Sequence, residues 1–236
     1  MIMPLSIAMY INKKKLFLAL IVLFLVTTIV ILGPNHSSKI ALLCAFLASL
    51  IIYFLGPRSF IYFGIISTIF ILSLPVISNT MVPLISSIEK KNHYDTPWQK
   101  TASGSSIVHR LLVWEYVGKE IYKKPFIGHG AGTSRLIGQN IVLNVPHTDQ
   151  EIKGAIPLHP HNNFLEIWLE LGLVGITIIT LFWIKIIKYG IKLRKQSYIL
   201  GTGICTSIVT IFIISNLSFG IFQAWWMSSL ALIFLI

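Results

Sequence analysis

The chain has 236 residues, of which 55% are hydrophobic and only 11% charged, and its mean hydropathy is +0.78. These values lie outside the range of soluble globular domains and indicate an integral membrane protein. The net charge of +11 comes largely from basic residues beside apolar segments, so it is weak evidence for nucleic-acid binding, and no nucleic-acid partner is expected.

Six apolar runs are long enough to cross about 30 Å of hydrocarbon. They predict an all-α fold with six transmembrane helices, at 16–33, 40–56, 59–78, 164–187, 198–216 and 219–236. The expected organisation has three parts, which are an N-terminal segment with three helices over 1–78, a large loop over 79–163, and three further helices over 164–236.

Both ends of the chain look cut within apolar sequence. Residues 1–12 are apolar but too short to cross a bilayer, and they lack the basic-then-apolar order of a signal peptide. Ile236 ends an apolar run that has no basic flank. We expect the N-terminal stretch to be a surface segment or the remnant of a preceding helix.

Three groups of basic residues flank the predicted helices. They lie in 13–15, at Arg58 and in 185–195, and the positive-inside rule places all three groups in the cytoplasm. Segments 34–39 and 79–163 then lie outside, in agreement with the parity of the spans. All seven histidines fall in these two outer segments, so the polar chemistry is expected on the outer face.

The outer segment is expected to begin with a helix from Ser103 to Lys124, which Pro125 ends and which Ser105 or Ser106 can cap. Its apolar positions suit a helix resting on the membrane surface. They are Ile107, Val108, Leu111, Leu112, Trp114 and Tyr116. Arg110 and Trp114 are four residues apart and share one face.

A glycine-rich stretch, Pro125–Arg135, follows this helix. Its backbone N–H groups can cradle phosphate oxygens, although taken alone it is better explained as a simple tight turn. It is not a P-loop, because no Gly-Lys-Ser/Thr follows. Residues 136–158 are expected to be irregular and to form a flap over the site.

The sequence His159-Pro-His-Asn-Asn163 then leads directly into the fourth apolar helix. Asn162, Glu166 and Glu170 are spaced by four and therefore share one helix face. Polar groups at a bilayer boundary are costly and usually functional, although a polar seam between helices is an equal alternative for the two glutamates. His159 and His161 lack the spacing of a metal motif, so no metal or other cofactor is expected.

The order of these segments resembles the O-antigen ligase and polymerase superfamily of bacterial inner membranes. The resemblance rests on an Arg-x-x-x-Trp helix, then Pro-Phe-Ile-Gly-His-Gly-Ala-Gly-Thr, then His-Pro-His-Asn-Asn-Phe-Leu-Glu-Ile-Trp-Leu-Glu-Leu-Gly-Leu-Val-Gly, over residues 105–180. A weaker match reaches Gly33-Pro-Asn-His-Ser-Ser-Lys39, where the family tends to have arginine.

The resemblance implies a glycosyltransferase of the membrane C-type (GT-C) fold in the bacterial inner membrane, with its active face in the periplasm. Such an enzyme takes a glycan from undecaprenyl diphosphate and transfers it to lipid A-core (ligase) or to another glycan (polymerase). Arg110 matches the family's loop arginine and His161 its His-Asn histidine, both tied to activity. Lys39 keeps the charge but lacks the bidentate fork of arginine.

The residue chemistry suits breakage of a sugar–diphosphate bond. Arg110, Lys39 and Arg135 can stabilise the departing diphosphate, with His159, Asn162 and Glu170 as further substrate-binding residues. His161 can accept the acceptor's proton or donate to the diphosphate, while Glu166 or Glu170 can orient His161 or act as base. Attack from the opposite face implies inversion.

Two other interpretations stay open. A polysaccharide transporter would use the intramembrane glutamates to line a path, and paired glycine-broken half-helices in both halves of the chain would favour it. A truncated, inactive remnant is the other, because the chain resembles only the C-terminal half of the family's members.

Overall fold

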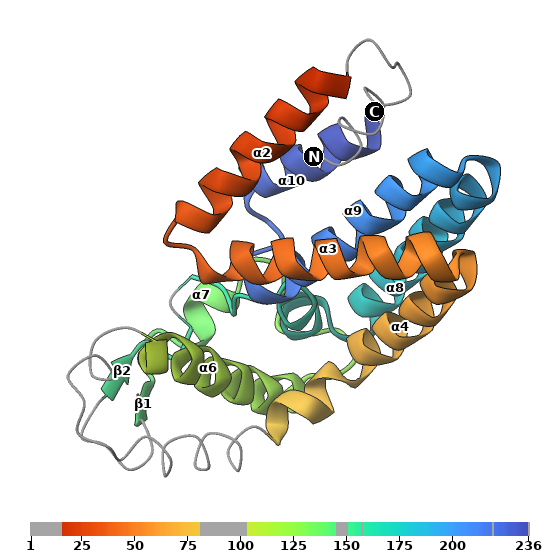
Figure 1. Cartoon of the computed structure of the whole chain (residues 1–236). Helices are drawn as coiled ribbons and strands as arrows, with labels where there is room; N and C mark the ends of the chain where they lie inside the picture. The colour runs from red at the N-terminus through yellow and green to blue at the C-terminus, as the bar shows by residue number, and fades with distance from the viewer. Residues whose placement is uncertain (1–15, 81–102, 145–150, 157, 219, 236) are drawn as a thin grey trace. The chain divides into compact units, whose positions relative to one another are not determined.

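Helices make up most of the structure, a computed structural model that describes residues 16–80, 103–144, 151–156, 158–218 and 220–235 (Figure 1). The expected fold class is therefore confirmed as mostly helical, with one short two-stranded hairpin in addition. The elements are α2 Leu16–Leu32, α3 His36–Leu55, α4 Pro57–Asn79, α6 Ser103–Lys123, α7 Ser134–Ile137, β1 Val142–Asn144, β2 Glu151–Lys153, α8 Asn163–Gln196, α9 Tyr198–Leu217 and α10 Ala224–Leu235. The apolar N-terminal stretch and His147 lie outside the described residues.

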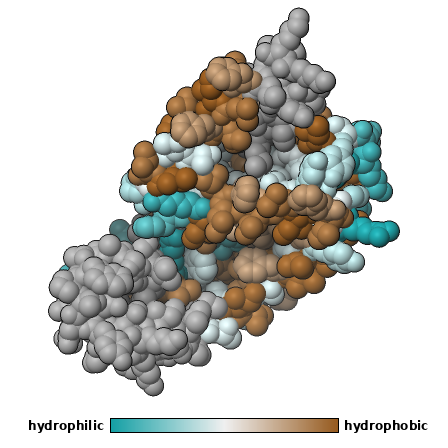
Figure 2. All heavy atoms as spheres, viewed as in Figure 1, coloured by the Kyte–Doolittle hydropathy of each residue, from teal (hydrophilic) through white to brown (hydrophobic). Residues whose placement is uncertain are grey.

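Four of these helices, α3, α4, α8 and α9, are long and apolar enough to cross a membrane. Large hydrophobic side chains cover much of the visible helical surface, as expected for helices that face lipid (Figure 2). Helices α2 and α10 have 17 and 12 residues, so the first and last of the six predicted spans remain predictions. The last predicted span also begins later than expected, because residues 220–223 form a turn before Ala224.

Contacts divide the described chain into two compact units. One comprises described residues within 1–69, 180–218 and 227–236, and the other those within 70–179 and 219–226. Helix α8 contributes its first part to the second unit and its last part to the first. The domain boundaries expected from sequence remain a prediction.

The first unit is held together by apolar packing and by a buried cation. The indole N–H of Trp183 donates to Ser67 Oγ at 2.9 Å, beside the rings of Phe63 and Phe212. Arg194 is buried, with its guanidinium 3.8 Å from the centre of the Tyr198 ring and donating to the carbonyl of Ile52. This cation therefore binds the C-terminal end of α3, where the helix dipole favours positive charge.

In the second unit, α8 is broken at Gly172, which has the non-helical angles φ 59° and ψ −152°. The segment 125–130 lies against this break and hydrogen-bonds to it. Pro125 and Phe126 accept from the N–H groups of Leu173 and Val174, while His129 and Gly130 donate to the carbonyls of Leu169 and Glu170. The backbone groups that the break removes from the helix are thus satisfied by the glycine-rich turn.

Helix α6 agrees with its predicted bounds to within one residue, but its environment differs from the expectation. Leu111 and Leu112 are buried within the protein, so these positions pack against protein rather than lie free on a membrane surface. The side chains of Ser105 and Ser106 are outside the described part of the chain.

The described residues of the stretch 136–158, which leave out 145–150 and 157, are more ordered than expected. They include the end of α7 and an antiparallel pair in which Val142 lies opposite Lys153 and Asn144 opposite Glu151. The prediction of an irregular segment was wrong here, because backbone pairing can stabilise strands too short to show a period in sequence.

Candidate functional site

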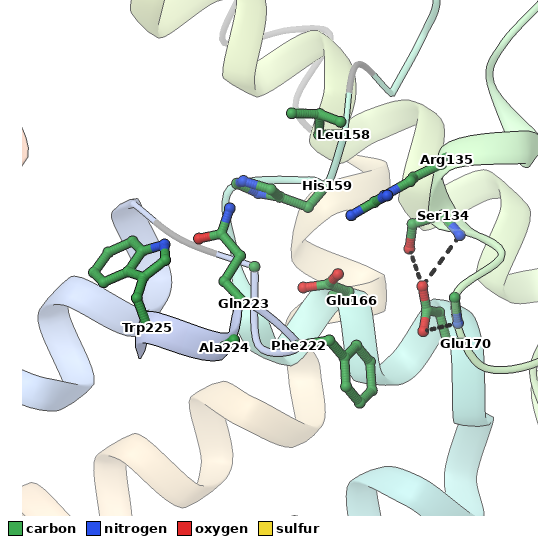
Figure 3. Close-up of a pocket in the computed structure, with 12 residues that line it drawn as sticks. Ser134, Arg135, Leu158, His159, Glu166, Glu170, Phe222, Gln223, Ala224 and Trp225 are labelled. Carbon is green, nitrogen blue, oxygen red and sulfur yellow. Dashed lines mark hydrogen bonds between the residues drawn. The ribbon is translucent and has the colours of Figure 1, made fainter. Parts of the chain in front are cut away.

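A cavity of about 510 Å³ lies within the second unit and brings together half of the site residues that the sequence singled out (Figure 3). Its wall is formed by Gly132, Ser134, Arg135, Leu158, His159, Glu166, Glu170, Gly220, Phe222, Gln223, Ala224 and Trp225. Its volume falls in the range of about 300–1,000 Å³ typical of small-molecule sites. Four predicted site residues, Arg135, His159, Glu166 and Glu170, therefore meet at one place.

Glu170 holds the glycine-rich turn in position. Its carboxylate accepts from the backbone N–H of Gly132 at 2.7 Å, from that of Ser134 at 3.1 Å and from Ser134 Oγ at 2.6 Å. The side chain is only 1% exposed, so these bonds compensate for the burial of its charge. The N–H groups of Gly132 and Ser134 thus bind a carboxylate of the chain itself, which removes them from the expected phosphate cradle.

Glu166 lies one turn earlier on α8 and is differently engaged. Its Oε2 accepts a 2.7 Å hydrogen bond from the backbone N–H of Ile221, and no described residue donates to its Oε1. The carboxylate borders the cavity together with Arg135, which is exposed and forms no ion pair within the described ranges. Glu166 therefore retains an oxygen for a ligand, whereas both oxygens of Glu170 are occupied.

His159 and His161 are joined by a tight turn. The backbone N–H of His161 donates to His159 Nδ1 at 3.1 Å, and the two ring centres are 4.4 Å apart. Burial, followed by the nearby His161 and Arg135, lowers the pKa of His159 to about 4. A neutral His159 that accepts at Nδ1 carries its proton on Nε2, so it can donate a hydrogen bond to a ligand.

The turn requires an unusual backbone conformation. His161 has φ 56°, and among the described residues it alone has a positive φ without being glycine. Such conformations are costly and concentrate at functional sites.

Helix α6 brings its polar face to the same turn. The indole N–H of Trp114 donates to the carbonyl of Pro160 at 2.8 Å. The pKa of His109 is lowered by burial, then by His161 and Arg110, and burial also lowers the pKa of Arg110. His161 acts on the pKa of both His109 and His159, so three imidazoles and Arg110 gather at the turn. Neither Arg110 nor His161 borders the cavity itself.

Two of the predicted substrate-binding residues do not border the cavity. Asn162 is fully buried, and its Oδ1 accepts from the N–H groups of Phe164 and Leu165, so it caps the start of α8. Lys39 lies in α3 and belongs to the other unit. A substrate role for either residue remains a prediction.

The sequence interpretation missed the wall formed by the α9–α10 connection, which contributes Phe222 and Gln223, and by the start of α10, which contributes Trp225. These residues lie in a run that was assigned to a membrane span. The available signal was Gln223, a polar residue that follows Gly220 within an otherwise apolar stretch. His109 was likewise counted only as one of seven outer histidines.

Comparison with known proteins gives concordant matches. The family model described as O-antigen ligase matches residues 20–180. Proteins named "putative polysaccharide ligase" from Rickettsia felis and Rickettsia conorii are each 30% identical, over 78% and 85% of this chain. A protein of that name from Rickettsia bellii is 26% identical over 94% of the chain. No solved structure matches.

The matched region accounts for 44%, 51% and 52% of these three proteins, so the chain spans about half the length of the curated relatives it matches. The family match includes the glycine-rich turn, the His-Pro-His-Asn-Asn turn and the start of α8. The α9–α10 connection lies beyond the residues of the family match.

Proposed function

This chain belongs to the O-antigen ligase family, and on that premise we propose that it transfers a glycan from undecaprenyl diphosphate to lipid A-core. The proposed reaction is metal-independent and inverts the anomeric carbon. The proposed location is the bacterial inner membrane, with the cavity facing the periplasm. The placement of the basic residues in the C-terminal turn of α8, after the acidic residues of its first turns, supports this orientation.

The observation that carries the proposal is the meeting of Arg135, His159 and Glu166 around one cavity. A cation can stabilise the departing diphosphate, and an imidazole or a carboxylate can accept the proton of the acceptor hydroxyl. Arg110 and His161 lie at the adjoining turn, where Trp114 anchors α6. A partly enclosed site also strengthens each electrostatic interaction, because water screens it less.

In the proposed reaction the acceptor hydroxyl oxygen bonds to the anomeric carbon as the bond from that carbon to the diphosphate oxygen breaks. The hydroxyl proton passes to His161 or Glu166, and the lipid diphosphate leaves with the bonding electron pair. Arg110 and Arg135 stabilise the negative charge that develops on the diphosphate. His161 can instead donate a hydrogen bond to that diphosphate.

Transfer of labelled glycan in membranes tests this proposal. Arg110→Ala and His161→Ala are expected to lower transfer by about 10²-fold or more at unchanged protein level. Arg58→Ala is the matched control, because Arg58 is exposed in the other unit and is expected to leave transfer unchanged. Full activity of both the Arg110 and the His161 variants would refute the site assignment.

Polymerisation of lipid-linked repeat units is the second candidate, since the same residues serve either acceptor. A ladder of lengthened glycan, in place of a single block on lipid A-core, would identify it. Transport is a third candidate, and the glycine break of α8 beside two glutamates is the observation in its favour. Movement of glycan across vesicles without any new glycosidic bond would identify a transporter.

A further inference from the structure

The α9–α10 connection forms a wall of the cavity that differs chemically from the wall opposite. In Figure 3, Gln223 and Trp225 lie on one side of the cavity and Arg135 and Glu170 on the other, while the Phe222 ring lies below Glu166. One wall is therefore aromatic and uncharged, and the other charged. A ligand that suits both walls has a charged part and an uncharged part.

Two close contacts fix this connection to the charged wall. Ile221 donates its backbone N–H to Glu166 Oε2, and Gly220 lies directly against the His159 ring. A Cβ atom at Gly220 would lie 2.9 Å from His159 Cγ and 3.1 Å from Glu166 Oε2. Only a residue without a side chain fits there, so the connection lies as close to the imidazole and the carboxylate as the backbone allows.

The groups of this wall suit a sugar better than a phosphate. Phe222 and Trp225 are 54% and 52% exposed, so their ring faces are accessible. The negative face of an aromatic ring attracts the weakly positive C–H groups on one face of a pyranose. Gln223 Oε1 is buried without a hydrogen-bond partner in the described structure, and it needs a donor. A sugar hydroxyl provides that donor, whereas an ionised phosphate oxygen does not.

We propose that residues 220–225, in the α9–α10 connection and the start of α10, bind the sugar of the lipid-linked donor, with Trp225 against a pyranose face and Gln223 bonded to a hydroxyl. The inference rests on the proposed function, which supplies a donor with a diphosphate and a sugar. It divides the cavity into a diphosphate part beside Arg135 and a sugar part beside Trp225.

The test compares two lipids that differ only in the sugar, which are polyprenyl diphosphate and the same lipid carrying N-acetylglucosamine. Their Kd values are measured on the full chain in nanodiscs by microscale thermophoresis. We expect the wild-type protein to bind the sugar-bearing lipid about tenfold more tightly. Trp225→Leu and Gln223→Ala should each lower this ratio by roughly three- to tenfold, with the Kd of the sugar-free lipid unchanged.

Two control variants sharpen the comparison. Trp225→Phe keeps an aromatic face and is expected to retain most of the ratio. Phe126→Leu removes an aromatic ring that is 69% exposed and does not border the cavity, so it should leave the ratio unchanged.

The outcomes distinguish failure of the sugar-binding proposal from failure of the proposed function. A wild-type ratio near one would overturn the proposal that residues 220–225 bind the sugar. Equal weakening of both lipids by Trp225→Leu would also overturn it, and would indicate that the indole contacts lipid. Failure of the wild type to bind the sugar-free lipid would count against the diphosphate-linked donor itself. If Arg110→Ala or His161→Ala abolishes glycan transfer while the ratio of the two Kd values stays as in the wild type, each proposal is supported independently.

Discussion

Glu166 Oε2 accepts a 2.7 Å hydrogen bond from the backbone N–H of Ile221, which lies 55 residues further along the chain. The bond joins the first turns of α8 to the α9–α10 connection. It leaves Glu166 with two separable tasks, which are to hold this connection through one oxygen and to present the other to the cavity.

Substitution of Glu166 is expected to separate these tasks. Glu166→Gln retains an oxygen that accepts from Ile221, so the free energy of unfolding should change by less than about 1 kcal/mol. Because the charge is lost, glycan transfer should fall by about 10²-fold. Glu166→Ala leaves the Ile221 N–H without its acceptor and should also cost about 1–3 kcal/mol of stability. Equal transfer by Glu166→Gln and wild type would show that the residue has only a positioning role.

A pair of glycine substitutions tests the packing at the break in α8. Gly172 and Gly56 have similar angles, φ 59° and ψ −152° against φ 73° and ψ −161°, so alanine imposes a similar backbone strain at both. A Cβ atom at Gly172 would lie 2.6 Å from the Gly128 nitrogen, whereas nothing lies within 4 Å at Gly56. Gly172→Ala should therefore destabilise the protein by about 1–3 kcal/mol more than Gly56→Ala, measured by unfolding in detergent.

His159 gives stability a defined dependence on pH. Its pKa is lowered to about 4 in the folded state, while an unfolded imidazole has a pKa of about 6.5. Between these values the unfolded chain binds a proton that the folded chain does not, so stability is retained above about pH 6.5 and declines as the pH falls toward 4. His159→Gln should show a shallower fall of Tm between pH 7 and pH 4.5. Identical slopes for the two proteins would contradict a buried neutral imidazole.

The bond from Trp114 to Pro160 is expected to affect activity more than stability. Trp114→Phe removes the 2.8 Å hydrogen bond and should cost about 1 kcal/mol of unfolding free energy. It should also lower transfer, because the bond positions α6 and Arg110 against the histidine turn. Tyr116→Phe is the matched control on the same helix, since it deletes only the hydroxyl, which donates to the Ile137 carbonyl at 3.1 Å and also interacts with Glu120. Equal transfer by both variants would remove the positioning role of Trp114.

Local signals in the sequence predicted α6 well. Serines at its start and Pro125 after its end mark the helix without reference to the rest of the fold. The four-residue spacing likewise placed Glu166 and Glu170 on one face, and both border the cavity. These features depend on neighbours within one or two turns of a helix.

Partners that are distant in sequence could not be predicted in this way. Glu170 binds Gly132 and Ser134, which are 38 and 36 residues earlier, and no periodicity reports such a contact. The sequence of the glycine-rich turn therefore also allows a phosphate cradle. Gln223 was assigned to a span because hydropathy averages over a window, so a single polar residue among apolar neighbours is not seen.

The pairing of 125–130 with the break at Gly172 also couples the glycine-rich turn to residues 169–174 of α8, so that the two segments move as one rigid unit. Four backbone hydrogen bonds join them, and neither can shift by a residue without losing its partners. A displacement of the segment that carries Glu166 must therefore be transmitted to Gly132 and Arg135. The backbone segments that carry the carboxylate and the cation would then move together in any motion that admits the proposed lipid-linked glycan.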